Sequence, residues 1–278
     1  MDTQHDKALR FQALHRQDDC FIVPNPWDPG SARLLAHLGF PALATTGAGF
    51  AFSRGLPDGA VGREAMLAHV RDLACATALP LSVDLENGFG DAPETVAETI
   101  RLAAEAGAVG GSIEDTSGKR EAPLYPLSQA VERIQAAVEA ARRLPFPFTL
   151  TARAENFMAG HPDLDDALRR LQAYEAAGAD VLFAPGLKSR EQIAAMTGAL
   201  SRPVNVIMGF QGVRLNLDEL RALGVRRVSV GGSLARAALG AFLRAAREIR
   251  DEGSFGYADE AIPGPEINRL FRQLARPA

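Results

Sequence analysis

The sequence predicts an α/β fold, a (β/α)8 barrel of the TIM type, and three observations lead to that prediction. Eight short apolar segments rich in Val, Ile and Leu are each followed by a stretch with helical spacing, at intervals of roughly 20–40 residues. The apolar segments lack polar alternation, which is typical of parallel strands covered on both faces. Ala-Gly-Ala junctions at 106–108 and 177–179 end a helix and lead directly into a strand. A doubly wound open sheet is the competing architecture, but eight regular units favour the closed barrel.

The predicted elements follow one another along the whole chain. A polar helix over 4–17 comes first, and Asp28, Ser31 and Gly39 provide the start and stop signals of the next helix. The small residues of 47–55 indicate a loop. The predicted strands span 20–24, 41–46, 79–85, 108–113, 147–153, 180–183, 203–208 and 227–230. The helices that follow them span 26–38, 63–78, 92–106, 126–144, 163–177, 189–198, 217–223 and 233–252.

No linker divides the sequence, so residues 1–278 are expected to form one barrel domain with a C-terminal tail over 253–278. A further helix over 265–274 lies in that tail. Its apolar face must be buried somewhere, which indicates packing against another subunit of a homo-oligomer.

Composition excludes several classes of function. The 278 residues are 47% apolar, the net charge is −4 and the pI is about 5.8, so nothing favours nucleic acid or an anionic membrane as a partner. No apolar run reaches the length of a membrane span, and residues 1–17 lack the apolar core of a signal peptide. Cys20 and Cys75 form neither a disulfide framework nor a metal spacing. We therefore expect a soluble, cytoplasmic protein.

The most informative stretch is 80–91, where an apolar strand runs into Asp84, Glu86 and a Gly-x-Gly turn. In a strand, side chains two positions apart point the same way, so the two carboxylates are expected to share a face. Mg²⁺ or Mn²⁺, which prefers oxygen ligands, would explain two acids at the end of a buried strand. A strand end whose carboxylates accept hydrogen bonds from loop amides explains them equally well, and both interpretations stay open.

Other polar residues follow the neighbouring strands, at the end of a barrel where active sites lie. Glu114 follows the fourth strand, and Arg153 and Glu155 follow the fifth. Arg binds a substrate carboxylate through a bidentate fork, whereas an internal ion pair with Glu114 or Glu155 is the structural alternative for Arg153. Thr45, Thr46 and Gly47 could cradle carboxylate or phosphonate oxygens through backbone amides, or form an ordinary turn.

The segment 116–125 after the fourth strand is a candidate lid, although an ordinary solvated loop has the same composition. Lys119 lies in it and could protonate or hold a reaction intermediate. The five histidines show no ligand spacing, and neither cysteine is placed as a nucleophile.

Four motifs, at strand ends and in this order, resemble the isocitrate lyase/phosphoenolpyruvate mutase superfamily. They are Thr-Thr-Gly at 45–47 leading to Gly-Leu-Pro-Asp at 55–58, Val-Asp-Leu-Glu-Asn-Gly-Phe-Gly at 83–90, Ser-Ile-Glu-Asp at 112–115 and Thr-Ala-Arg-Ala-Glu at 151–155. The resemblance extends from about residue 21 to residue 240. It is specific to the superfamily and much less specific to any one activity.

The resemblance implies a set of roles. Asp84 would ligate Mg²⁺ directly, while Glu86, where the family commonly has Asp, and Glu114 would hold it through water. Thr45, Thr46 and Gly47 would bind the substrate carboxylate or phosphonate, and Arg153 would grip substrate oxygens. Asp58 would lie at the rim near the reacting group. The family also implies a tetramer, a dimer of dimers, often with exchanged C-terminal helices.

The positions at which this chain departs from the family's motifs narrow the range of activities that it is expected to have. In the family, isocitrate and methylisocitrate lyases carry a loop with Cys and His after the fourth strand. This chain has Ser-Gly-Lys-Arg-Glu-Ala-Pro at 117–123 instead, with neither residue. Ala-Pro-Gly at 184–186 also replaces a Glu of those lyases. The chain thus resembles a mutase-like branch that lacks the lyase Cys, which argues against isocitrate or methylisocitrate cleavage.

Three hypotheses follow. The first is a Mg²⁺-dependent lyase that breaks or forms a C–C bond next to a small α-keto or 2-hydroxy (di)carboxylic acid through an enolate, with Asp58, Lys119, Arg153 and Glu114 as catalytic candidates. The second is phosphonopyruvate mutase or hydrolase chemistry on a P–C bond. The third is an α-keto acid binding protein without catalysis.

Overall fold

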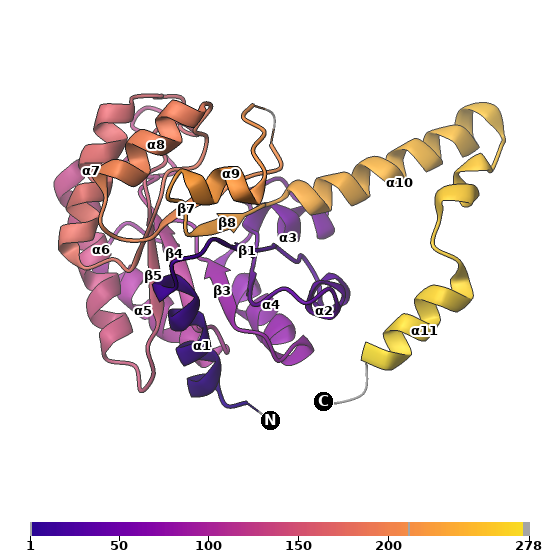
Figure 1. Cartoon of the computed structure of the whole chain (residues 1–278), viewed down its shortest axis with the longest axis horizontal. Helices are drawn as coiled ribbons and strands as arrows, with labels where there is room; N and C mark the ends of the chain where they lie inside the picture. Colours follow the sequence, from indigo (N-terminus) through magenta and orange to yellow (C-terminus); the bar gives the residue numbers. More distant parts are fainter. Residues whose placement is uncertain (1, 211, 275–278) are drawn as a thin grey trace.

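The computed structural model describes residues 2–210 and 212–274, and in it eight parallel strands form a barrel surrounded by helices (Figure 1). The strand order is β1-β8-β7-β6-β5-β4-β3-β2. Between β1 and β2 the barrel is closed by one backbone hydrogen bond, from the Ala44 N–H to the Pro24 carbonyl at 3.1 Å. The strands are β1 (Phe21–Val23), β2 (Leu43–Ala44), β3 (Leu81–Asp84), β4 (Gly110–Glu114), β5 (Thr149–Arg153), β6 (Val181–Phe183), β7 (Val204–Ile207) and β8 (Arg227–Ser229). The predicted (β/α)8 barrel is therefore confirmed.

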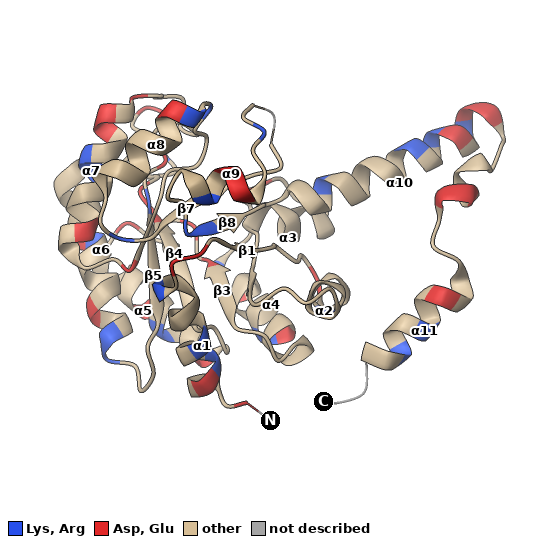
Figure 2. Ribbon diagram, viewed as in Figure 1, with Lys and Arg blue, Asp and Glu red and all other residues tan. Residues whose placement is uncertain are grey.

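Helices pack around the outside of these strands. They are α2 (Pro29–His37), α3 (Gly47–Ser53), α4 (Arg63–Ala76), α5 (Pro93–Glu105), α6 (Leu127–Arg142), α7 (Leu164–Ala177), α8 (Arg190–Ala199) and α9 (Leu217–Ala222). Helix α10 (Ser233–Glu252) begins at the barrel and then leaves it (Figure 1). The N-terminal helix α1 (Gln4–Arg16) packs against the barrel through Phe11, whose ring lies so close to Gly110 that a Cβ there would be 2.8 Å from it. Acidic and basic residues are interspersed over the outer helices (Figure 2). None of the described helices is both long enough and apolar enough to cross a bilayer.

The core has an apolar outer layer and a polar centre. Branched and aromatic side chains fill the space between the strands and the helices. Inside the barrel, where Val, Ile and Leu usually dominate, the buried residues include polar ones: Ser82, Ser112, Thr151, Asn205, Arg227 and Ser229. The expectation that the strands lack polar alternation is wrong for several of them. The inward positions of β3, β4, β5 and β8 alternate polar side chains with apolar outward ones.

Two local expectations near the second and third strands are wrong. The segment 47–55, predicted as a loop, contains helix α3, because the Thr46 hydroxyl caps it by accepting the Gly49 N–H at 3.1 Å. The third strand ends at Asp84, and Glu86 has a left-handed backbone with φ of 48°. Strand alternation therefore does not place Glu86, yet its carboxylate and that of Asp84 both approach Gly47, as described below.

The C-terminal segment extends away from the barrel. In Figure 1 helix α10 leaves the barrel, and the chain then returns through η1 (Gly256–Glu260) to α11 (Gly264–Leu274). Within α10 only Ala235 is buried, and Phe242, beyond the barrel, is 67% exposed. Helix α11 lies near α2, where a Cβ on Gly30 would be 3.8 Å from the ring of Phe271. The predicted tail helix is present, and its exchange between subunits stays a prediction.

Candidate active site

A cavity of about 890 Å³ opens at the carboxyl ends of the strands, and it contains most of the predicted site residues. Thr45, Thr46, Asp58, Asp84, Glu86, Glu114, Arg153 and Glu155 all line it. A site at this end of the barrel is where the strand ends can bring side chains from several loops together.

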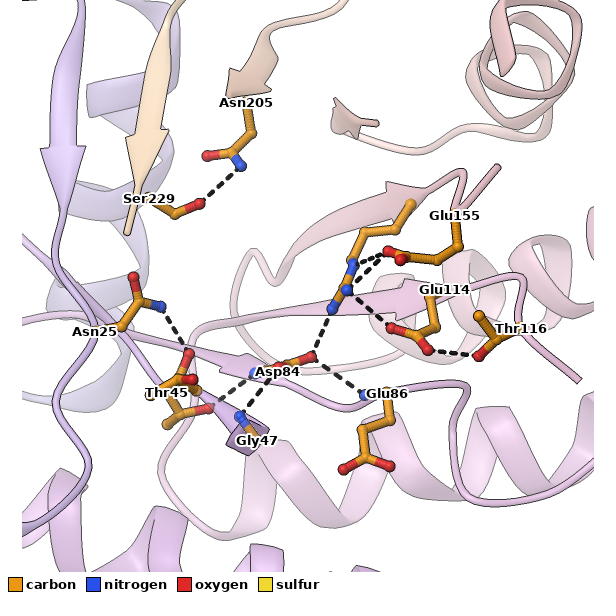
Figure 3. A network of polar contacts seen from close by, with 12 residues as sticks. Asn25, Thr45, Gly47, Asp84, Glu86, Glu114, Thr116, Glu155, Asn205 and Ser229 are labelled. Carbon is orange, nitrogen blue, oxygen red and sulfur yellow. Dashed lines mark hydrogen bonds and ion pairs between the residues drawn. The ribbon is translucent and has the colours of Figure 1, made fainter. Parts of the chain in front are cut away.

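Asp84 connects two sides of this cavity (Figure 3). Its Oδ2 accepts the Gly47 N–H at 3.1 Å, and its own N–H donates to the Thr45 hydroxyl at 2.9 Å. Its Oδ1 lies 2.8 Å from Nη1 of Arg153. The second strand, the third strand and the fifth strand thus meet at one carboxylate.

Arg153 is the electrostatic centre of the site. Its Nη2 lies 2.9 Å from Glu114 and 2.7 Å from Glu155, in addition to the contact of Nη1 with Asp84. The internal ion pair considered as an alternative for Arg153 is therefore present, with both glutamates. These contacts raise the pKa of Arg153 against the opposing effect of burial. A substrate carboxylate that uses this guanidinium must share it with three acids or displace one of them.

Among the described residues of the cavity, Glu86 has a buried carboxylate oxygen without a partner. Its Oε1 is buried and accepts no hydrogen bond from any residue in the described ranges. Burial, followed by repulsion from Asp84, Glu114 and Asp58, raises the pKa of Glu86 to about 8. A Cβ placed on Gly47 would lie 3.2 Å from this oxygen and 3.4 Å from Asp84 Oδ2, so the glycine leaves space in front of both carboxylates.

The donor chemistry of the site fits a hard divalent cation. Asp84, Glu86 and Glu114 offer carboxylate oxygens, the ligands that Mg²⁺ and Mn²⁺ prefer, and the orphaned Oε1 of Glu86 lacks a positive partner. Over residues 2–210 and 212–274, no three acidic, His or Cys side chains converge closely enough to hold an ion. The reason is visible in the contacts, because Arg153 lies between Asp84 and Glu114.

The remaining predicted residues divide into two groups. Asp58 lines the cavity, and burial together with the charge of Asp84 raises its pKa. Gly47 lies beside the carboxylates and begins α3. Lys119, in contrast, is outside the cavity lining: its ammonium pairs with the exposed Asp91 at 2.9 Å. The segment 116–125 folds back on itself through an antiparallel bridge between Thr116 and Leu124.

Sequence reasoning missed the residues that support the site from behind. Asp115 accepts the Glu155 N–H at 2.8 Å and the Tyr174 hydroxyl at 2.6 Å, which fixes the backbone after β5. Arg133, from α6, is 1% exposed and donates to carbonyl oxygens of the loop after β3. Arginine in the middle of an amphipathic helix reads as a surface residue, so nothing in the sequence marked Arg133.

The sequence and the fold of this chain are similar to those of known proteins. Residues 11–250 match the model of the phosphoenolpyruvate phosphomutase family. An oxaloacetate decarboxylase from Chromohalobacter salexigens is 31% identical over 257 residues, which cover 90% of this chain and 87% of the relative. A solved structure from Burkholderia cenocepacia J2315, described as a lyase/mutase, has 64% identity, a TM-score of 0.96 and 98% coverage of both chains. A phosphonopyruvate hydrolase solved with oxalate and Mg²⁺ has 27% identity, a TM-score of 0.85 and coverage of 96% and 95%.

Proposed function

Because the chain belongs to the phosphoenolpyruvate phosphomutase family, we propose that it is a Mg²⁺-dependent lyase that cleaves a C–C bond in a small 2-keto or 2-hydroxy acid. The observation that carries the proposal is the group of acids around Arg153 and Gly47, with Glu86 Oε1 left unpartnered. The similarity to an oxaloacetate decarboxylase supports a 2-keto dicarboxylate as substrate.

In this proposal Asp84, Glu86 and Glu114 hold the cation, with Mn²⁺ as the alternative to Mg²⁺. When bound, the cation supplies positive charge that stabilises an enolate developing next to the substrate carboxylate. Arg153 turns part of its guanidinium from the acids to the substrate carboxylate. Thr45 and Thr46 line the cavity on the other side, and Gly47, whose N–H donates to Asp84, is proposed to bind that carboxylate with them. These groups orient the bond to be cleaved.

Asp58 is the proposed acid that returns a proton to the carbanion carbon. Its raised pKa supports that role, because burial and Asp84 both favour the protonated carboxyl. The absence of Cys and His from 117–123 separates this chain from the isocitrate and methylisocitrate cleavage that the sequence argued against.

The test is a Mg²⁺-dependent assay on oxaloacetate, pyruvate, isocitrate, methylisocitrate and phosphonopyruvate, with product identification and an EDTA control. We expect turnover of a 2-keto dicarboxylate that Asp84→Asn reduces by about 100-fold or more, whereas Asp218→Asn, at an 87% exposed side chain, leaves it unchanged. Turnover that persists unchanged in EDTA would contradict the proposal.

A second function is favoured by the likeness to phosphonopyruvate hydrolase. Release of phosphate from phosphonopyruvate would assign P–C chemistry to the same site. Stabilisation of the fold by an acid without any product would instead assign a binding protein.

We also propose a homo-oligomer, a dimer of dimers with exchanged C-terminal helices. Helix α10, which leaves the barrel in Figure 1, supports this, because it carries the exposed Phe242 and Leu243. Exposed apolar surface of this kind marks a protein interaction site.

A further inference from the structure

The floor of the cavity is polar and lies on the opposite strands from the acids. Arg227 and Ser229 come from β8 and Asn205 comes from β7, and all three line the cavity. Nε of Arg227 donates to Asn205 Oδ1 at 2.8 Å, and Asn205 Nδ2 donates to the Ser229 hydroxyl at 3.0 Å. Figure 3 shows the contact between Asn205 and Ser229 in the upper part of the view, with Asp84 and Glu86 in the lower part.

Within residues 2–210 and 212–274, Arg227 is a buried cation with no anion beside it. The residue is 4% exposed, its Nη1 has no hydrogen-bond partner there, and the charge that acts on it is the positive charge of Arg153. Arg153 and Arg170 differ, because they pair with acids, and Arg133 differs because its guanidinium donates to backbone carbonyl oxygens of the loop after β3. A buried unpaired charge is costly, so a fold that keeps one is expected to use it.

The surroundings of Arg227 favour an anion as the missing partner. Among the described residues its side chain donates to an amide oxygen, that of Asn205, and its buried Nη1 has no acceptor. Burial and the positive charge of Arg153 lower the pKa of Arg227 to about 9, so the group stays cationic at neutral pH while its environment lacks negative charge. A planar carboxylate is the group that a guanidinium binds best.

We infer that Arg227, with Asn205 and Ser229, forms a carboxylate subsite in the barrel floor, which binds the substrate carboxylate that lies farthest from the acids of β3 and β4. The inference rests on the proposed function, because it assigns the second carboxylate of the same substrate. It makes the enzyme selective for dicarboxylates over acids with a single carboxylate, and it makes Arg227 a specificity-determining residue.

The experiment compares oxaloacetate with pyruvate as ligands in the presence of Mg²⁺, by KM where there is turnover and by competition where there is none. Arg227→Gln should weaken the binding of oxaloacetate by roughly 10- to 100-fold, which is the range of one charge-assisted hydrogen bond. The affinity for pyruvate should stay within about twofold of the wild-type value. Arg226→Gln is the matched control, because this neighbouring arginine contacts the exposed Asp18 on the outer surface.

Ser229→Asp is the second variant, in case the first fails to fold. It places a carboxylate two positions from Arg227 on the same inward face, so it should neutralise the guanidinium and remove the selectivity in the same way. The inference would be overturned if either folded variant lost affinity for oxaloacetate and pyruvate equally. It would also be overturned if the selectivity for oxaloacetate over pyruvate stayed unchanged.

A metal-free arm separates this inference from the proposed function. In EDTA at constant ionic strength, formate should raise the thermal midpoint of the wild-type protein more than that of Arg227→Gln. If neither acid binds with Mg²⁺ but formate shows this difference, the subsite stands and the proposed function fails. If formate stabilises both proteins equally and neither acid binds, both ideas are wrong.

Discussion

At the scale of single residues, the site consists of one guanidinium group and the carboxylates that pair with it. Arg153 contacts Asp84, Glu114 and Glu155, while Glu86 has none of these contacts. The strand-end positions of Asp84, Glu114 and Arg153 could be predicted from the sequence, because parallel strands deliver their carboxyl ends to one edge. The pairing itself could not, since which acid Arg153 contacts depends on side-chain packing across strands.

Lys119 provides a test at this scale. In the structure its ammonium is held by Asp91 outside the cavity, so a catalytic role requires the segment 116–125 to move. We expect Lys119→Ala to lower kcat by roughly 100-fold or more with little effect on Mg²⁺ affinity, as for loss of a proton donor. Steady-state kinetics at several Mg²⁺ concentrations would measure this.

Asp91→Asn is the control for Lys119, because it removes the surface partner and keeps the lysine. It should leave kcat within about twofold, in line with the small contribution of exposed ion pairs. Full activity of Lys119→Ala would reduce the segment to a cover over the cavity.

At the scale of elements, one helix fixes the loop that follows β3. Arg133 of α6 donates to the carbonyl of Gly90 at 2.6 Å and also to the carbonyls of Asn87 and Asp91, and its guanidinium lies 4.2 Å from the Tyr125 ring centre. The loop that follows β3 is therefore tied to the middle of α6 by one buried guanidinium.

Replacing Arg133 should lower both the stability of the fold and the affinity for the metal. Arg133→Met leaves buried carbonyl groups without donors, so we expect a loss of about 2–4 kcal/mol in the free energy of unfolding. Mg²⁺ affinity should fall roughly tenfold, as for other supports of metal ligands. Urea denaturation and metal titration measure the two effects. Arg143→Met, at the exposed end of the same helix, should change stability by less than about 0.5 kcal/mol.

Most elements could be predicted because their boundaries carry local signals. The predicted helix over 233–252 matches α10, and the glycines that end α5 and α7 mark helix stops in the sequence. Helix α3 was missed because glycines and alanines suit a turn as well as a helix, and only the Thr46 cap decides. The polar floor was missed although Arg227 and Ser229 flank Val228 in β8, a pattern that marks one polar face.

At the scale of the whole molecule, stability should depend on two buried histidines. Burial, with the charge of Arg227, lowers the pKa of His15 to about 3, and burial lowers the pKa of His69 to about 4. Below pH 6.5 these two histidines bind protons in the unfolded chain but not in the folded chain, so their contribution to stability is full above pH 6.5 and is lost as the pH falls toward the folded values. Glu86, whose pKa is raised in the folded protein, acts with the opposite sign. Between pH 6.5 and pH 5, each histidine should lower the free energy of unfolding by about 2 kcal/mol.

Urea denaturation at pH 7 and pH 5 measures this dependence. His15→Gln should reduce the slope by about 1.4 kcal/mol per pH unit, whereas His37→Gln, at an exposed histidine, should not change it. An unchanged slope in His15→Gln would mean that the ring is already protonated in the folded protein.

Assembly is the second test at this scale. If α10 packs against another subunit, Phe242→Glu places a charge in that interface and should shift the protein to smaller species in analytical ultracentrifugation. Glu252→Lys, at the end of the same helix, is the control for a change of charge alone. A wild-type protein that sediments as a monomer at micromolar concentration would contradict the proposed exchange.

The seam of the barrel has a consequence for how the protein is made. Strand β1 pairs with β8, and the Asn25 side chain accepts the Gly231 N–H across a separation of 206 positions. During synthesis on the ribosome β1 must therefore wait, unpaired on that side, until β8 has emerged. Arg227 arrives with β8, so the newly made chain completes its barrel and the cation in its floor in the same step.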